Sequence, residues 1–302
     1  MAINTRRMAA IVIALKKKGL WREMTKVHKE ALGIYRPISS GTLKKSLIRV
    51  HGKLLPVSIS EELAKSSIAK VITPDLVQQS ISKMPALHFS QVGIKNIYFL
   101  DEAGFKSGIT SSTVFSRNLS DVEKAATLRA LRKREGFGGA VVGVHRRGRI
   151  LISAGGIEKI IDTRVGKELQ RLRKSNASLP SAVEIERVRK SNYENLLSEV
   201  LLHETIHNLD NRVGDAALIK PGLSGAPDFL RAQGLGENWY RLSGGERSIA
   251  IEGFVTDYIS YLGGDQRFKA DMPEKYAVMK QVFEDYEARY YMIPSRFWRA
   301  DR

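Results

Sequence analysis

The stretch LLHETIHNLD, residues 201–210, decides how this sequence is interpreted. It holds two histidines four residues apart, His203 and His207, with Glu204 directly after the first. Residues four apart on an α-helix return to nearly the same face, so both imidazoles can point at one ion. Glu204 projects beside them, where a carboxylate can take a proton from a water molecule. The pattern predicts a site for one Zn²⁺ ion held by nitrogen donors.

The surrounding sequence favours this interpretation, because residues 181–212 form the longest helical pattern in the chain. Val200–Leu202 lead into the motif, and Gly214 is a plausible stop at the C-terminal end. The alternative is a pair of histidines on a half-buried helix face that bond to carbonyl groups or water.

A catalytic zinc needs a third protein ligand and an open fourth position. A glutamate on the helix expected from about 244 to 262 would supply it, and two candidates exist. Glu246 lies three residues after Ser243, which is the capping-box arrangement and already explains its presence. We favour Glu252, because a carboxylate among the apolar residues of that helix would be costly unless it bound a metal.

Asp210 follows His207 by three residues and shares its helix face. A variant of the motif that uses a third histidine needs Gly at 210 and His at 213, and this chain has Asp210 and Val213. That variant is therefore excluded. Asp210 either accepts a hydrogen bond from a ligand imidazole or is a solvated carboxylate at the helix end.

The charge is unevenly distributed along the chain. The net charge is +17, and residues 1–150 hold 27 Lys and Arg against 10 Asp and Glu, whereas residues 151–302 hold 22 of each. A basic first half favours contact with a polyanion such as nucleic acid, although a solvated basic surface would have the same composition. The chain has no cysteine, so His, Asp and Glu must supply any metal ligands.

The expected secondary structure changes near residue 91, from a helical pattern to a mixture of strands and helices. Residues 1–90 are expected to be a mainly helical, basic region, and residues 91–302 a separate α+β domain. In that domain we expect a strand at 94–100, a helix at 121–135 and a β-hairpin at 136–156, GFGGAVVGVHRRGRILISAGG. Gly148 can supply the positive φ that the hairpin turn requires.

The hairpin has a possible functional role. An extended substrate can pair as an extra strand along a sheet edge, and either arm, AVVGV or ILIS, could be that edge. Gly138-Gly139 would permit close approach of the backbone. The alternative is that both arms are core strands, and the sequence does not separate the two.

The motif, followed after a long loop by EGFVTDY, resembles the HExxHxxD…ExF pattern of zinc metallopeptidases with a glutamate as third ligand. It is most similar to the group of anthrax lethal factor and the Pro-Pro endopeptidases. This resemblance implies a zincin-like fold, with a small mixed sheet, an edge hairpin, the motif helix and C-terminal helices. It implies His203, His207 and Glu252 as zinc ligands and Glu204 as general base.

That group also has an oxyanion-stabilising tyrosine shortly before the third ligand. The nearest upstream tyrosine is Tyr240, which is farther away than in the family pattern. We take Tyr240 as the candidate, with Tyr258 and Tyr261 as alternatives.

The sequence thus predicts a zinc-dependent endopeptidase that acts on protein or peptide substrates. The alternative is a protein that binds nucleic acid or another polyanion through residues 1–150, with a structural or vestigial metal motif. No run is apolar enough to span a membrane, and the apolar stretch at 8–15 leads into Lys16–Lys18 without a cleavage site. We therefore expect a soluble protein, either cytoplasmic or delivered without a recognisable signal peptide, such as an effector or toxin.

Overall fold

The computed structural model describes residues 43–110, 142–146, 148–175, 178–216 and 222–284. The helix expected at 121–135 and Gly138-Gly139 lie outside these residues. The strands are β1 (Leu43–Val50), β2 (Lys53–Ser60), β3 (Asn96–Leu100), β4 (Gly143–Arg146) and β5 (Arg149–Ser153). The α-helices are α3 (Glu61–Ala64), α4 (Pro74–Ser82), α5 (Ala86–Val92), α6 (Glu102–Thr110), α8 (Ala154–Lys174), α9 (Ala182–Ala216), α10 (Pro227–Ala232), α11 (Gly244–Leu262), α12 (Gln266–Asp271) and α13 (Pro273–Glu284), and the short 3₁₀ helices are η1 (Ser67–Lys70), η2 (Leu223–Gly225) and η3 (Trp239–Arg241).

The strands form one mixed sheet in the order β1-β2-β3-β5-β4. The three central strands are parallel to one another, and each outer strand is antiparallel to its neighbour. β3 and β5 are buried along their whole length, as expected for strands covered on both faces. The fold is therefore α+β with a small mixed sheet, as the sequence predicts.

Residues 43–60 are strands, although they lie in the region expected to be mainly helical, whose residues 61–92 do contain the helices α3, η1, α4 and α5. They form the hairpin β1–β2, closed by His51 and Gly52, which both have positive φ. This turn type twists in the same sense as the strands, which is why it suits a two-residue hairpin. β2 pairs with β3, and the buried residues of both regions belong to one core, so sheet and core cross the boundary expected at residue 90.

The second hairpin, β4–β5, is confirmed. Gly148 has a φ of +76° in the turn, and Arg146 pairs with Arg149. β5 lies inside the sheet and β4 at its edge, which separates the two arms that the sequence left equivalent. The strand β4 also extends farther than expected, so His145 lies within it and pairs with Ile150.

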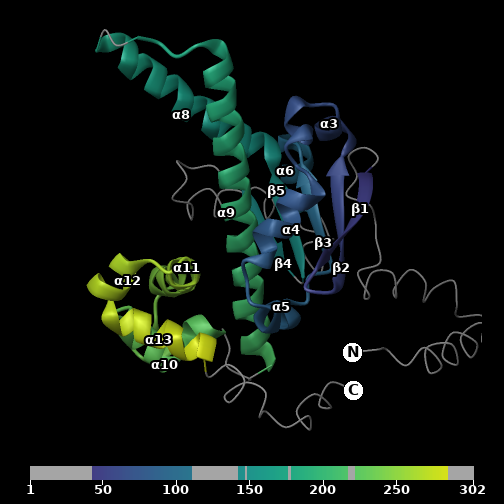
Figure 1. The fold of residues 1–302 in the computed structure, drawn as a ribbon. Helices are drawn as coiled ribbons and strands as arrows, with labels where there is room; N and C mark the ends of the chain where they lie inside the picture. The colour runs from purple at the N-terminus through teal and green to yellow at the C-terminus, as the bar shows by residue number, and fades with distance from the viewer. Residues whose placement is uncertain (1–42, 111–141, 147, 176–177, 217–221, 285–302) are drawn as a thin grey trace, which may run out of the picture.

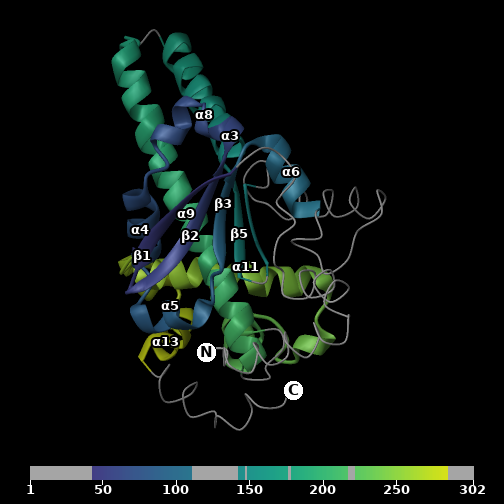
Figure 2. The same ribbon diagram turned by 90° about the vertical axis from the view of Figure 1, so that its right-hand side faces the viewer.

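The long helix α9 crosses one face of the sheet, together with α4 and α5, while α6 lies on the other side (Figures 1 and 2). The motif lies in the half of α9 that runs beside the sheet. Residues 204–210 there are all buried, because β4, β5 and α5 pack on α9 from one side and η2 and α11 from another. The helix continues to Ala216, so Gly214 does not end it.

The C-terminal helices α10–α13 form a second group beside the lower half of α9 (Figure 1). α11 begins at the capping box that the sequence predicts, with Ser243 accepting from the backbone of Glu246 and Glu246 accepting from that of Ser243. A hydrogen bond of 2.6 Å between Nδ1 of His88 and the hydroxyl of Tyr258 joins α5 to α11. This buried contact helps to fix α11 relative to the sheet.

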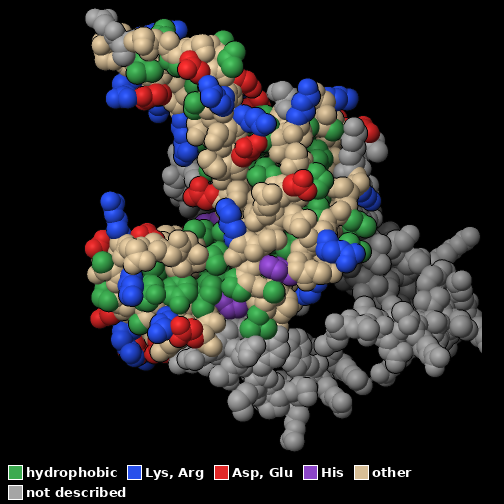
Figure 3. All heavy atoms as spheres, viewed as in Figure 1, with side chains coloured by type: hydrophobic (Ala, Val, Ile, Leu, Met, Phe, Trp, Pro, Cys, Tyr) green, Lys and Arg blue, Asp and Glu red, His purple; other side chains and the backbone are tan. Residues whose placement is uncertain are grey.

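The other halves of α8 and α9 project away from the sheet (Figure 1). Basic and acidic side chains are interspersed over this projection (Figure 3), with ion pairs such as Arg189 with Asp162 and Arg171 with Glu168. None of the helices in the described part of the chain is long and apolar enough to cross a membrane.

Candidate metal centre

Three of the side chains singled out from the sequence converge where α11 packs on α9. Nε2 of His203 lies 3.0 Å from Nε2 of His207. The carboxylate oxygen Oε2 of Glu252 lies 3.3 Å from the first nitrogen and 3.4 Å from the second. The structure therefore brings together two imidazoles and one carboxylate from two helices, as a group that could hold a metal ion.

The spacing of these atoms fits a small tetrahedral ion. Zinc bonds of about 2.0–2.1 Å place neighbouring tetrahedral ligands about 3.3–3.4 Å apart. The observed separations of 3.0, 3.3 and 3.4 Å form one face of such a tetrahedron. The side chain of His207 is 5% exposed, but those of His203 and Glu252 are 26% and 45% exposed, so the cluster is open to solvent on one side.

α11 places Glu252 in the cluster and leaves Glu246 out of it. Glu246 accepts a 2.7 Å hydrogen bond from the backbone of Ser243, which occupies its carboxylate at the helix start. Glu252 lies almost two turns later, on the opposite side of the helix from the buried Phe254. The apolar face thus anchors α11, and the ligand face meets α9.

Glu204 lies directly under the edge strand β4. A Cβ atom at Gly143 would come within 2.7 Å of Oε1 of Glu204 and within 2.9 Å of Cγ1 of Val200. Only a glycine allows the strand to approach the helix so closely. The strand and the motif helix therefore come closest at Gly143, whereas Gly138-Gly139 lie outside the described residues.

His145 is a site residue that the sequence analysis missed. It shares a face of β4 with Gly143, and its Nδ1 lies 2.9 Å from Oε2 of Glu204. Its ring stacks on that of His207, with 4.8 Å between centroids and 17° between planes. From the sequence we expect His145 in the hairpin turn. Its side chain faces the motif helix only because β4 continues through it.

Asp210 has neither of the two roles considered for it. It is 2% exposed, and it accepts hydrogen bonds from the backbone nitrogen and the hydroxyl of Ser224, at 2.8 and 2.7 Å. It therefore fastens the loop around η2 to α9. Nδ1 of His207 is buried without a hydrogen-bond partner among the described residues, so packing between the His145 and His203 rings holds its ring in place.

The three candidate tyrosines lie in different surroundings. Tyr240 lies in η3, before α11, and is 74% exposed. Tyr258 is fully buried and bonded to His88, and the ring of Tyr261 packs on Tyr276. Tyr258 is therefore part of the core, Tyr261 is half-buried, and Tyr240 is the most exposed of the three.

The ionisable side chains of the cluster shift one another's pKa. Burial disfavours the charged form of Glu204, but the hydrogen bond from His145 and the nearby imidazoles of His207 and His203 together outweigh it, so the pKa of Glu204 is lowered. Burial opposes ionisation of Glu252 as well, yet its bonds to the two ligand histidines lower its pKa. Burial lowers the pKa of His207, but the bond to Glu252 and the nearby carboxylates outweigh burial, so its pKa is raised. Protons therefore compete with a metal ion for Nε2 of His207.

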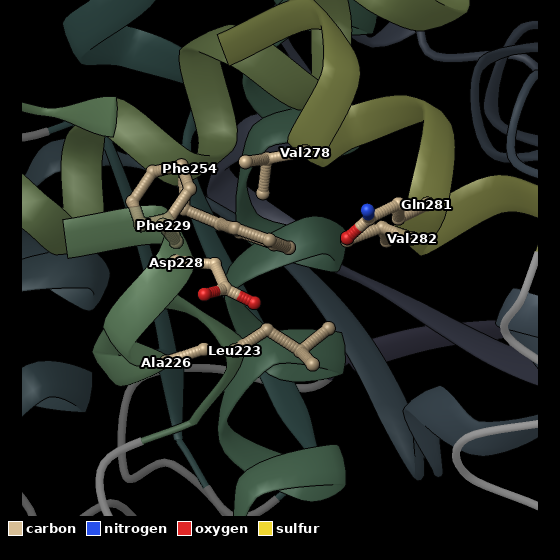
Figure 4. Close-up of a pocket in the computed structure, with 8 residues that line it drawn as sticks. All are labelled: Leu223, Ala226, Asp228, Phe229, Phe254, Val278, Gln281 and Val282. Atoms are coloured by element: carbon tan, nitrogen blue, oxygen red, sulfur yellow. The ribbon is translucent and has the colours of Figure 1, made fainter. Parts of the chain in front are cut away.

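A separate small pocket, of about 30 Å³, lies among the C-terminal helices (Figure 4). Its walls are mostly apolar and include Phe229 and Phe254, whose rings pack edge to face with centroids 5.5 Å apart. It holds no more than about two water molecules. We regard it as a packing gap in the core that anchors α11.

Comparison of the chain with protein-family models, with curated proteins and with solved structures finds no match.

Proposed function

We propose that this protein is a zinc-dependent endopeptidase. The observation that supports it best is the convergence of His203 and His207 from α9 with Glu252 from α11, at the separations of a tetrahedral face. Glu204, the residue that the motif resemblance makes the general base, lies next to this group. The cluster is open to solvent on one side, as a catalytic site requires.

Each residue has a distinct role in the proposed hydrolysis. His203, His207 and Glu252 would hold the ion, which when bound supplies Lewis acidity that makes water more acidic and a carbonyl more electrophilic. Glu204 accepts a proton from the attacking water as the oxygen adds to the peptide carbonyl carbon. The same carboxylate delivers that proton to the nitrogen when the C–N bond breaks.

The edge strand β4 is the proposed seat for the substrate. Among the described residues β4 pairs with β5 alone, so an extended peptide could add to its other side through backbone hydrogen bonds. The position of Gly143 over Glu204 would bring such a peptide next to the base. The exposed Tyr240 is the proposed donor to the developing oxyanion.

The test combines metal content with peptide cleavage. Purified wild-type protein should contain one zinc per chain by plasma mass spectrometry, and His203→Ala should contain far less. Glu204→Gln should keep the metal but cleave a mixed peptide library about 10²–10⁴-fold more slowly. Glu199→Gln, the same change at an exposed position of α9, should cleave like the wild type. A wild type without stoichiometric metal, or an active Glu204→Gln, would refute the proposal.

The uneven charge supports a second candidate, binding of a polyanion. Residues 1–42 alone hold nine Lys and Arg against two Asp and Glu. Binding of the full chain to a fluorescent oligonucleotide should then fall steeply between about 50 and 200 mM salt. It should weaken on removal of residues 1–42 and be unaffected by a chelator. Binding that does not depend on salt would rule out this candidate.

A further inference from the structure

We propose that His145 is a positioning residue for Glu204, and that Asn211 fixes the tautomer in which His145 acts. The proposal rests on the proposed function, since it assigns Glu204 the work of a base. It adds two residues outside the HExxH motif and the ligand set.

The contacts form a continuous chain across β4 and α9. Nδ1 of His145 lies 2.9 Å from Oε2 of Glu204, and Nε2 lies 2.8 Å from Nδ2 of Asn211. The same amide nitrogen of Asn211 lies 3.0 Å from the backbone carbonyl of His207. The chain therefore begins at the backbone of one metal-ligand candidate and ends at the base.

The direction of each hydrogen bond follows from its acceptor. A carbonyl oxygen can only accept, so the amide nitrogen of Asn211, not its oxygen, must face His207. This nitrogen has two hydrogens and donates the second to Nε2 of His145, which must therefore carry no proton. The neutral His145 ring then has its proton on Nδ1, and donates it to the Glu204 carboxylate.

A neutral donor suits a base better than a cation would. A protonated imidazole at 2.9 Å would form an ion pair with Glu204 and reduce its affinity for a proton. A neutral N–H holds Oε2 in place and leaves the carboxylate its full charge. The terminal torsion of a glutamate is otherwise broad, so this bond limits the rotation of the carboxylate about its own axis.

The position of His145 in the fold adds a second function. It belongs to β4, the strand on which a peptide would be seated, and its ring also stacks on His207. One side chain thus sets the orientation of the base, the plane of a ligand imidazole and the distance of both from the edge strand.

Enzyme kinetics test the positioning role. His145→Leu removes both hydrogen bonds, and we expect kcat for peptide cleavage to fall about 10–100-fold with KM nearly unchanged and the zinc still bound. His145→Asn keeps an amide donor at the level of Nδ1 and should recover most of kcat. His51→Asn, which removes an exposed histidine from the β1–β2 turn, should match the wild type. Thermal melts establish that each variant is folded.

Nitrogen NMR on histidine-labelled protein gives a readout that needs no activity. The His145 ring should carry a proton on Nδ1 and none on Nε2, in both metal-free and zinc-loaded protein. Asn211→Asp, which replaces the donor by an acceptor, should move a proton to Nε2.

The two sets of results separate the two proposals. Two results overturn the positioning role alone, provided that the wild type cleaves peptides. One is a His145 proton on Nε2, and the other is a fall in kcat of less than twofold in His145→Leu. A wild type that cleaves no peptide overturns the proposed function, and the positioning role falls with it.

Discussion

Replacing Gly143 by alanine tests the contact between β4 and the motif helix. A methyl group there would lie 2.7 Å from Oε1 of Glu204, 2.8 Å from its Cγ and 2.9 Å from Cγ1 of Val200. Ordinary contacts begin at 3.4 Å, so the neighbours must give way by roughly 0.5–0.7 Å. Val200 is 4% exposed and His145 holds Glu204, so neither can move at little cost.

The strand β4 must therefore shift in Gly143→Ala. Overpacking of this kind destabilises a fold by about 1–3 kcal/mol. For a chain of this length, that corresponds to a fall in Tm of roughly 2–5 °C. Peptide cleavage should fall as well, because a displaced β4 lengthens the bond between His145 and Glu204.

Gly166→Ala is the matched control, because it makes the same change within α8, where no described atom outside the helix's own backbone lies within 4 Å of the new Cβ. Alanine there should stabilise the protein by about 0.5–1 kcal/mol. Denaturation by urea and by heat would measure both variants. A Gly143→Ala protein as stable as the wild type would refute the close approach of β4 to α9.

Four further predictions concern the cluster and its surroundings. Glu252→Ala should lose most of its bound zinc on dialysis whereas Glu246→Ala should keep it, and the reverse would exchange their roles. Tyr240→Phe should lower kcat about 10²–10³-fold without changing Tm. Tyr258→Phe should instead cost about 1–2 kcal/mol of stability, through its lost buried bond to His88, and leave kcat unchanged; a catalytic defect there would contradict its place in the core. Burial raises the pKa of Asp210 from 3.8 to about 6, so the metal-free native state binds more protons than the unfolded state between these pH values. Stability should therefore fall by up to about 3 kcal/mol as pH rises from 4 through 6, and Asp210→Asn should lack this fall when unfolding is measured across that range.

Some features of the molecule follow from the sequence because their causes are local. The motif helix depends on hydrogen bonds and side-chain contacts three or four residues apart. The capping box at Ser243 and Glu246 and the turn at Gly148 are equally short-range, and the structure has both. The hairpin β1–β2 has an equally local cause, because the His51-Gly52 turn lies between two segments of strand composition.

Other features depend on contacts between residues far apart in the chain, and only the tertiary structure decides these. Glu204 meets His145, which is 59 residues away, because the register of β4 turns that side chain toward α9. Tyr258 meets His88 across 170 residues, and this bond removes it from the candidates for catalysis. The sequence by itself determined which side chains can bind a metal and move a proton, because these are properties of residue type and helical spacing. The packing of α11 and β4 on α9 decided which of these side chains lie within reach of one another. This packing is driven by burial of apolar surface, which is not specific to residue pairs, so its outcome is not encoded locally in the sequence.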